Sequence, residues 1–282
     1  MTERRGVVVG YDGSRQSEAA VRWAAEAARL RGVPLTVVHA WEMFSAVGPM
    51  AIPVADLRAA AEEVVAEGAR HARDVAAGVD AHAVLGRGGP TTALIEAAAG
   101  AELLVVGSRG RGGFTDLVLG STGVELAAHG PCPVVVVREH RVEGPVVVGV
   151  DGSAAAQEAL GLAFTEARLR GADLVALVAW PADADPGPAP LVDAAGLREF
   201  AGDRLTRIVA PWREKHPDVA VRTEVVTGPP RQVLLTAAKD AGLLVVGSRG
   251  LGGFRGLLLG SVSHALLHHA ACPVAVAHAP RD

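Results

Sequence analysis

The sequence of 282 residues is poor in lysine, aromatic residues and cysteine, and these shortages narrow the classes of protein that it can represent. Lys215 and Lys239 are the only lysines, aromatic residues make up 4% of the chain, and the formal net charge is -4. Proteins that bind nucleic acids usually combine a basic surface with aromatic side chains that stack on bases. We therefore expect no nucleic acid among the partners.

Long apolar runs are also missing, although half of the residues are hydrophobic. No run reaches the roughly 18 apolar residues that indicate a membrane-spanning helix. The first ten residues, MTERRGVVVG, place charges directly before a short apolar run and lack the longer apolar region of a signal peptide. These features predict a cytoplasmic protein that does not enter a membrane.

The two cysteines, Cys132 and Cys272, each begin the tripeptide CPV, and neither has a second cysteine at CxxC spacing. Three histidines gather near the C-terminus, at His264, His268 and His269, without carboxylate or cysteine partners at ligand spacing. The pattern predicts buried, apolar cysteines and no metal site built by the protein itself.

The chain contains two copies of one unit, because sliding the sequence by 139 to 140 positions brings similar segments into register. The segment VVVGYDGS from Val7 returns as VVVGVDGS from Val146, and each copy closes on a CPV segment. Such a duplication predicts two similar domains, at 1–140 and 144–282, joined by a short charged linker.

Each copy alternates short apolar runs with helical patterns. Continuous apolar strands separated by amphipathic helices are typical of a parallel sheet that is covered on both faces. We therefore expect an α/β fold, in which each half is a five-stranded parallel sheet covered by about four helices. In the first copy the predicted strands are Val7 to Tyr11, Leu35 to Ala40, Asp80 to Leu85, Leu103 to Gly107 and Val134 to Val137.

A glycine-rich segment follows the fourth predicted strand of each copy. It reads GSRGRGGFTDLVLGS from Gly107 and GSRGLGGFRGLLLGS from Gly247, with eleven identities over fifteen positions. A P-loop is excluded because neither lysine lies beside it, and the dinucleotide fingerprint fails because its third glycine would fall on Thr115. Both copies keep a spacing instead: a glycine, two residues, a glycine, nine residues, then Gly-Ser.

This spacing suits an anion-binding loop, and it also suits an ordinary connection between a strand and a helix. Glycines can adopt positive φ and let backbone amides approach phosphate oxygens. Gly120 and Ser121 open a predicted helix, whose free N–H groups and positive dipole end favour an anion. Ser121 can also cap that helix and donate its hydroxyl to a phosphate. On the residues alone, both interpretations stay open.

The segment VGYDGS, the G-2x-G-9x-G-S/T spacing and the closing CPVVVV together resemble the universal stress protein family in its tandem two-domain form. The resemblance covers nearly all of both halves, and it implies Rossmann-like domains with strand order 3-2-1-4-5. In the ATP-binding branch of that family, the glycine spacing holds the ribose and phosphates. The first-strand aspartate and the end of the second strand hold the adenosine.

The resemblance thus implies ATP as the ligand, with or without Mg²⁺, at one site in each half. Matched by motif, and with the loop arginines added as candidate phosphate partners, the first site comprises Gly10, Asp12, Ala40, Gly107, Arg109, Gly110, Gly120, Ser121 and Thr122. The second site comprises Gly149, Asp151, Ala179, Gly247, Arg249, Gly250, Gly260, Ser261 and Val262. No catalytic residue is assigned.

Asp12 and Asp151 have a second interpretation, as turn residues that bond their own backbone in the segment DGS. Arg109 and Arg249 can likewise be solvated rather than paired with phosphate. Both interpretations of each pair stay open.

The two copies differ at positions that bear on phosphate binding. Val262 stands at the position of Thr122 and lacks its hydroxyl, and Leu251 stands at the position of Arg111 and lacks its positive charge. We therefore expect the first site to hold a triphosphate more tightly than the second.

Three functions follow from these features. The first is an ATP-binding sensor or regulator in a stress or dormancy response, which acts through an unidentified downstream protein. The second is a slow ATPase or phosphotransferase, for which no lysine is evident near the glycine segment. The third is a scaffold with empty sites, which conflicts with two intact spacings.

The last apolar strands, at 134–137 and 274–277, are expected to pair with another strand. Exposed apolar edges invite such pairing. The family resemblance implies pairing at this strand, which can join the two halves of one chain or two chains in a homodimer.

Overall fold

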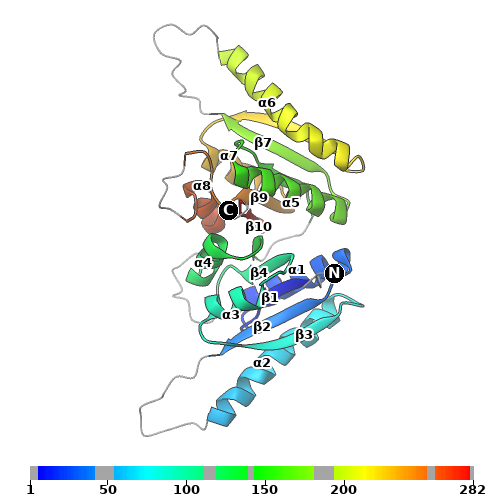
Figure 1. Cartoon of the computed structure of the whole chain (residues 1–282), viewed down its shortest axis with the longest axis vertical. Helices are drawn as coiled ribbons and strands as arrows, with labels where there is room; N and C mark the ends of the chain where they lie inside the picture. The colour runs from blue at the N-terminus through cyan, green and yellow to red at the C-terminus, as the bar shows by residue number, and fades with distance from the viewer. Residues whose placement is uncertain are drawn as a thin grey trace. The chain divides into compact units, whose positions relative to one another are not determined.

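The computed structural model describes residues 6–41, 54–110, 119–138, 143–180, 194–252 and 258–279. The chain divides into two compact units, Met1–Glu139 and His140–Asp282. In each unit, strands and helices alternate along the sequence (Figure 1).

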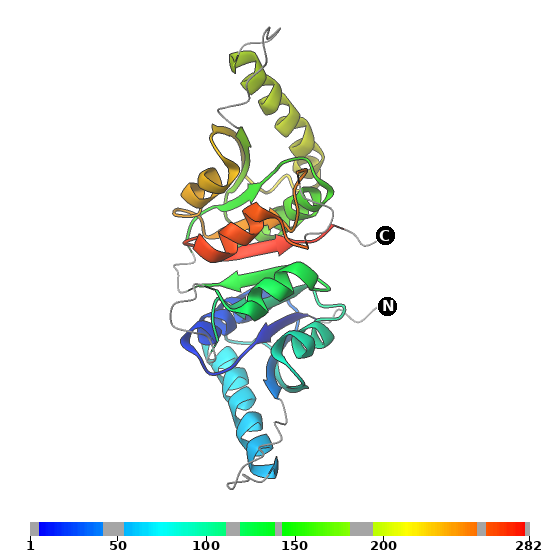
Figure 2. The same ribbon diagram turned by 90° about the vertical axis from the view of Figure 1, so that its left-hand side faces the viewer.

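The first unit has five parallel strands within its described residues, in the order β3-β2-β1-β4-β5. Helix α2 packs along β2 and β3 (Figure 1), and the short helix α4 packs on β5 (Figure 2). The elements are β1 (Val7–Gly10), α1 (Arg15–Arg31), β2 (Leu35–Trp41), α2 (Val54–Val75), β3 (Ala81–Arg87), α3 (Pro90–Ala97), β4 (Leu103–Gly107), α4 (Ser121–His129) and β5 (Val134–Val137).

The second unit repeats this arrangement, with the described strands in the order β8-β7-β6-β9-β10. Its elements are β6 (Val146–Gly149), α5 (Ala154–Arg170), β7 (Leu174–Trp180), α6 (Ala194–Lys215), β8 (Val221–Thr227), α7 (Pro230–Ala237), β9 (Leu243–Gly247), α8 (Ser261–His269) and β10 (Val274–Ala277). The expected α/β fold, strand order included, is confirmed.

The central strand of each unit lies at the point where the strand order reverses. In the first unit, β1 pairs with β2 on one side and with β4 on the other. In open parallel sheets, ligands bind in the crevice that such a reversal opens at the carboxyl ends of the strands. The segments that follow β1 and β4 therefore occupy the place where a site is expected.

The apolar runs form strands that are buried on both faces, which is why they show no alternation of polar and apolar residues. Val7, Val8 and Val9 of β1 are each at most 1% exposed, and Val146 to Val148 of β6 are equally enclosed at 3% or less. Cys132 and Cys272 are both buried and are not joined in a disulfide, and burial raises the pKa of the Cys132 thiol to about 12. The buried, apolar character predicted for the cysteines agrees with this environment.

The first helix of each unit begins and ends on the same pair of signals. Ser14 caps α1 by accepting a hydrogen bond from the Ser17 amide (3.2 Å), and Ser153 caps α5 in the same way. Gly32 and Gly171 follow the helices with φ of 64° and 61°, a conformation that favours glycine at a helix end.

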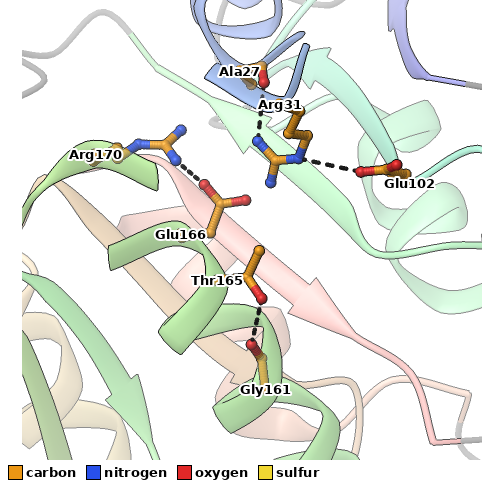
Figure 3. A network of polar contacts seen from close by, with 7 residues as sticks. All are labelled: Ala27, Arg31, Glu102, Gly161, Thr165, Glu166 and Arg170. Carbon is orange, nitrogen blue, oxygen red and sulfur yellow. Dashed lines mark hydrogen bonds and ion pairs between the residues drawn. The ribbon is translucent and has the colours of Figure 1, made fainter. Parts of the chain in front are cut away.

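An arginine ends each of these helices, but its carboxylate partner comes from a different place in each unit (Figure 3). Arg31 donates to the Ala27 carbonyl (3.1 Å) and pairs with Glu102, at 3.7 Å between Nε and Oε2. Arg170 pairs with Glu166 one turn earlier in its own helix, beside a Thr165 hydroxyl that donates to the Gly161 carbonyl. Both units therefore have an ion pair at the end of this helix, but the carboxylate comes from a different position of the sequence in each.

The two units also differ in the sizes of two side chains, one after the first strand and one on the helix beside it. Tyr11 follows β1, and its ring lies against Gly68 of α2, where an added Cβ would come within 2.6 Å of Tyr11 Cδ1. The corresponding residues of the second unit are Val150 and Ile208. A large residue after the strand thus goes with a glycine on the helix, and a smaller one goes with a larger helix residue.

We expect Gly68→Ala to lower the free energy of unfolding by about 1 to 3 kcal/mol, because its methyl group overpacks the Tyr11 ring. The matched control is Gly202→Ala in α6, where the nearest atom to an added Cβ is Val225 Cγ2 at 3.7 Å. That change should raise stability by roughly 0.5 to 1 kcal/mol through helix propensity. Denaturant unfolding measures the free energy of unfolding of both variants. Stabilisation by Gly68→Ala would refute the packing argument.

None of the helices within the described ranges is long and apolar enough to cross a membrane.

Candidate functional site

A cavity of about 510 Å³ lies in the first unit, where β1, β2 and β4 end. All nine residues predicted for the first site line it: Gly10, Asp12, Ala40, Gly107, Arg109, Gly110, Gly120, Ser121 and Thr122. They come from four separate segments of the sequence. The structure thus brings the whole predicted set together around one space.

Other lining residues were not predicted from the sequence. Tyr11, His39 and Gly123 adjoin predicted positions along the chain, whereas Ser17 lies in the first turn of α1, five residues after Asp12. Val38, Pro90, Leu94, Val106 and Leu119 add an apolar wall. Pro90 and Leu94 belong to α3, and nothing in the sequence marked that helix as part of the site.

The Asp12 carboxylate stands between the first strand and the glycine segment. Its Oδ1 accepts hydrogen bonds from the Ser14 amide (3.0 Å) and the Ser14 hydroxyl (2.6 Å), across a turn at Gly13 with φ of 77°. Its Oδ2 lies beside Gly110, where an added Cβ would be 2.6 Å away. One carboxylate oxygen of Asp12 therefore stabilises the turn, and the other lies beside the glycine segment at the cavity.

The glycines of the spacing do not owe their identity to backbone conformation. Gly107, Gly110 and Gly120 all lie in the described part of the chain, and none has positive φ, so a left-handed conformation is not the reason for these glycines. Gly107 is needed because an added Cβ would lie 2.7 Å from the backbone of Gln16. Gly120 has room, since the nearest atom to an added Cβ is the Ser108 carbonyl oxygen at 3.8 Å.

Helix α4 begins without a side-chain cap, which corrects the expectation that Ser121 caps it. Gly120 is the N-cap residue, with φ of -72° and ψ of 148°, and Ser121 is the first residue of the helix. The Gly120 amide donates to the Ser108 carbonyl (2.9 Å) and closes the glycine segment. Because the first residues of α4 line the cavity, its first-turn N–H groups and positive dipole end are available to an anion there.

The second unit repeats the link between aspartate and glycine segment. Asp151 accepts from the Ser153 amide through Oδ1 and from the Leu251 amide through Oδ2, both at 2.9 Å. The Ser153 hydroxyl donates to the Arg249 carbonyl (3.2 Å), and an added Cβ on Gly250 would lie 2.5 Å from Asp151 Oδ2. The Asp151 carboxylate therefore holds the start of the glycine segment against the turn after β6.

The other residues predicted for the second site take up equivalent places. Gly247 packs on the first turn of α5, and Gly149 packs against Leu234 and Val246. Gly260 is the N-cap of α8, which again has no side-chain cap, so Ser261 does not cap it either. Ala179 lies in β7, and Ser261 and Val262 are the first two residues of α8.

The two units differ in the polar groups near these positions. Tyr11, Ser17, His39, Thr122 and Gly123 of the first unit correspond to Val150, Ala156, Val178, Val262 and Ser263 of the second. Four side chains lose a polar group, while the buried Ser263 hydroxyl donates to the Gly247 carbonyl (2.7 Å). Arg111, the counterpart of Leu251, lies outside the described residues.

Two further observations concern charge at the first site. Burial, assisted by the negative charges of Glu67, Glu18 and Asp12, raises the pKa of Tyr11, so its phenol is neutral at physiological pH. Within the described ranges, no group of three or more histidine, cysteine, aspartate or glutamate residues is placed to hold a metal ion.

Comparison with known proteins shows the family of the chain. The family model described as the universal stress protein family matches the chain twice, at residues 3–138 and 144–278. The universal stress protein Rv2623 of Mycobacterium tuberculosis is 38% identical over 290 residues, covering 96% of each chain. A universal stress protein of Mycolicibacterium smegmatis is also 38% identical, again with 96% of each chain covered.

The fold is shared with a solved structure as well. The crystal structure of a universal stress protein from Archaeoglobus fulgidus superposes with a TM-score of 0.74 at 21% identity, covering 99% of this chain and all of that one. With two family matches that span most of its length, the chain belongs to the universal stress protein family and carries two of its domains in tandem.

Proposed function

We propose that this protein binds ATP in the cavity of its first unit and acts as a nucleotide-dependent regulator. The observation that carries the proposal is the cavity itself, which joins an uncapped helix start to an apolar wall. The amides of Ser121 and Thr122, in the first turn of α4, suit the phosphates. The wall made by Val38, Pro90 and Leu94 suits a planar base.

Asp12 and Arg109 provide the charged groups of this site. The Oδ2 atom of Asp12 can accept a hydrogen bond from a ribose hydroxyl, or bind Mg²⁺ that arrives with the nucleotide. Arg109 can pair with a phosphate oxygen, because guanidinium groups match the geometry of phosphate. Both residues line the same cavity, so one nucleotide can reach both.

Regulation is favoured over catalysis by the same set of residues. Phosphoryl transfer needs a positioned base or water, a metal holder and positive charge near the leaving group. Among the described lining residues, Asp12 is the one carboxylate, and its Oδ1 is already bonded to Ser14. Among these described residues, a base and a metal holder would have to be the same side chain, so we propose turnover that is slow at most.

The test is to denature the purified protein, to chromatograph any nucleotide released, and to follow phosphate production by the native protein with added ATP. We expect bound or titratable ATP and little sustained phosphate release. Sustained production of ADP and phosphate would favour the ATPase. A protein that neither carries nor binds ATP would contradict the proposal.

A second, weaker ATP site in the second unit is part of the proposal. It is supported by the uncapped start of α8 and by the position of Asp151 beside Gly250. The second unit offers valine where Thr122 and His39 stand in the first. Fewer polar side chains are therefore available to a triphosphate there.

We expect Thr122→Val to weaken ATP binding at the tighter site about tenfold, because it removes a hydroxyl that can donate to a charged phosphate oxygen. The matched variant Val262→Thr should strengthen the weaker site. Isothermal titration of both variants and the wild type separates the two sites. Equal affinities of the two sites in the wild type would refute this asymmetry.

The cytoplasmic location, the downstream protein and the pairing of last strands stay predictions. We propose that β5 and β10 are the elements that pair, within the chain or in a homodimer. Light scattering of the purified chain with and without ATP distinguishes the monomer from the homodimer and shows whether the nucleotide changes association.

A further inference from the structure

His39 has a fixed tautomer at the first-unit cavity. It belongs to β2 and lines the cavity, and its Nδ1 lies 2.8 Å from the Tyr11 carbonyl oxygen. A carbonyl oxygen can only accept a hydrogen bond, so Nδ1 carries the proton. In the neutral ring, Nε2 is then the nitrogen with a free lone pair, and it can only accept.

The place of His39 in the sheet decides which part of a nucleotide it meets. Strands β2 and β4 lie on opposite sides of β1. The glycine segment follows β4 and leads to the start of α4, whereas His39 lies near the end of β2. A ligand whose phosphates lie at the start of α4 therefore turns its base toward β2.

We infer that His39 makes the first site selective for a purine base that carries an amino group at position 6. Nε2 accepts a hydrogen bond from the 6-amino group of adenine. A 6-oxo group, as in guanine, would set one lone pair against another and leave both acceptors unpaired. This inference rests on the proposed nucleotide site, and it assigns recognition of the base to His39.

The second unit offers a natural contrast. Val178 occupies the position of His39, and Val150 occupies that of Tyr11. Neither side chain can accept a hydrogen bond, so the second unit has no equivalent means of recognising the amino group through these side chains. Selectivity for adenine should therefore belong to the first unit.

His39 also ties β2 to the backbone after β1, and the test has to separate that role from recognition. In His39→Asn, the side-chain amide can still donate to the Tyr11 carbonyl, but no acceptor remains at the position of Nε2. In His39→Gln, the longer side chain can place an amide oxygen near the position of Nε2. The two variants thus differ in the proposed acceptor.

The experiment titrates the full chain with ATP and with purine riboside 5′-triphosphate, which lacks the 6-amino group. At the tighter site of the wild type we expect ATP to bind about tenfold more tightly than the analogue. His39→Gln should keep most of this preference, and His39→Asn should abolish it. Val178→Asn, at the same place in the second unit, should leave it unchanged.

The outcomes distinguish the inference from the proposal beneath it. If the wild type binds neither triphosphate, the proposed function fails. If both bind but their affinity ratio is the same in the wild type and in His39→Asn, the site stands and the role of His39 is refuted. GTP binding as tight as that of ATP at the first site would refute it as well.

Discussion

Gly120→Val is expected to lower the affinity of the tighter site for ATP by at least about 100-fold while the first unit stays folded. Gly120 is the N-cap of α4, and its φ of -72° and ψ of 148° are open to any residue. The nearest atoms to an added Cβ, the Ser108 carbonyl oxygen and Arg109 Cα, lie 3.8 and 3.9 Å away. A branched side chain therefore fits the protein and occupies the space that the phosphates need.

Titration calorimetry measures the affinity, and denaturant unfolding checks the fold, with a loss of at most about 1 kcal/mol expected from the poorer N-cap. Gly260→Val is the matched control, because it makes the same change at the start of α8 and should spare the tighter site. Unchanged ATP affinity in Gly120→Val would exclude the start of α4 as the phosphate site.

Gly107 shows why the glycine spacing cannot be interpreted from sequence as one set of ligand contacts. An added Cβ there would meet the Gln16 carbonyl carbon and oxygen at 2.7 Å, so the residue allows β4 to pass close to the first turn of α1. The same holds for Gly247 against Ala155. The first glycine of the spacing is a packing residue, whereas the last leaves space at the start of a helix.

The sequence predicted the elements well because the strands are buried on both faces. Runs such as those of β1 and β4 are continuously apolar, so their limits are easy to recognise, and the duplication doubles the evidence. Helix starts were harder. The pair Gly-Ser allows either residue to be the N-cap, and serine is usually preferred there. Only the backbone angles of Gly120 show that it takes the position.

The apolar wall of the cavity was missed for a different reason. Leu94 reaches the site from α3, which follows β3 at the edge of the sheet. Its contact with Gly10, where an added Cβ would lie 3.1 Å from Leu94 Cδ1, depends on how the helix crosses back over the sheet. No local sequence pattern predicts how α3 crosses the sheet. The sequence also did not predict that Arg31 pairs with Glu102 whereas Arg170 pairs with Glu166, because these pairs depend on where the two helices end in the fold.

Gly110→Ala is expected to weaken ATP binding at the tighter site by about 10- to 100-fold, through Asp12 rather than through backbone strain. The added methyl group would lie 2.6 Å from Asp12 Oδ2, so the carboxylate has to move. The Oδ1 atom of Asp12 is bonded to Ser14, which caps α1, and these bonds resist a movement of the carboxylate. We therefore expect the contact to push the glycine segment away from Asp12 as well, so that the segment no longer fits the phosphates.

A double-mutant cycle tests this route, since residues in contact show non-additive effects. In an Asp12→Ala background the carboxylate is gone, so adding Gly110→Ala should cost little further affinity. Gly250→Ala, which makes the matching change beside Asp151, should leave the tighter site unaffected. Strict additivity of Asp12→Ala and Gly110→Ala would show that Gly110 acts independently of Asp12, and the contact between them would not be the reason for the glycine.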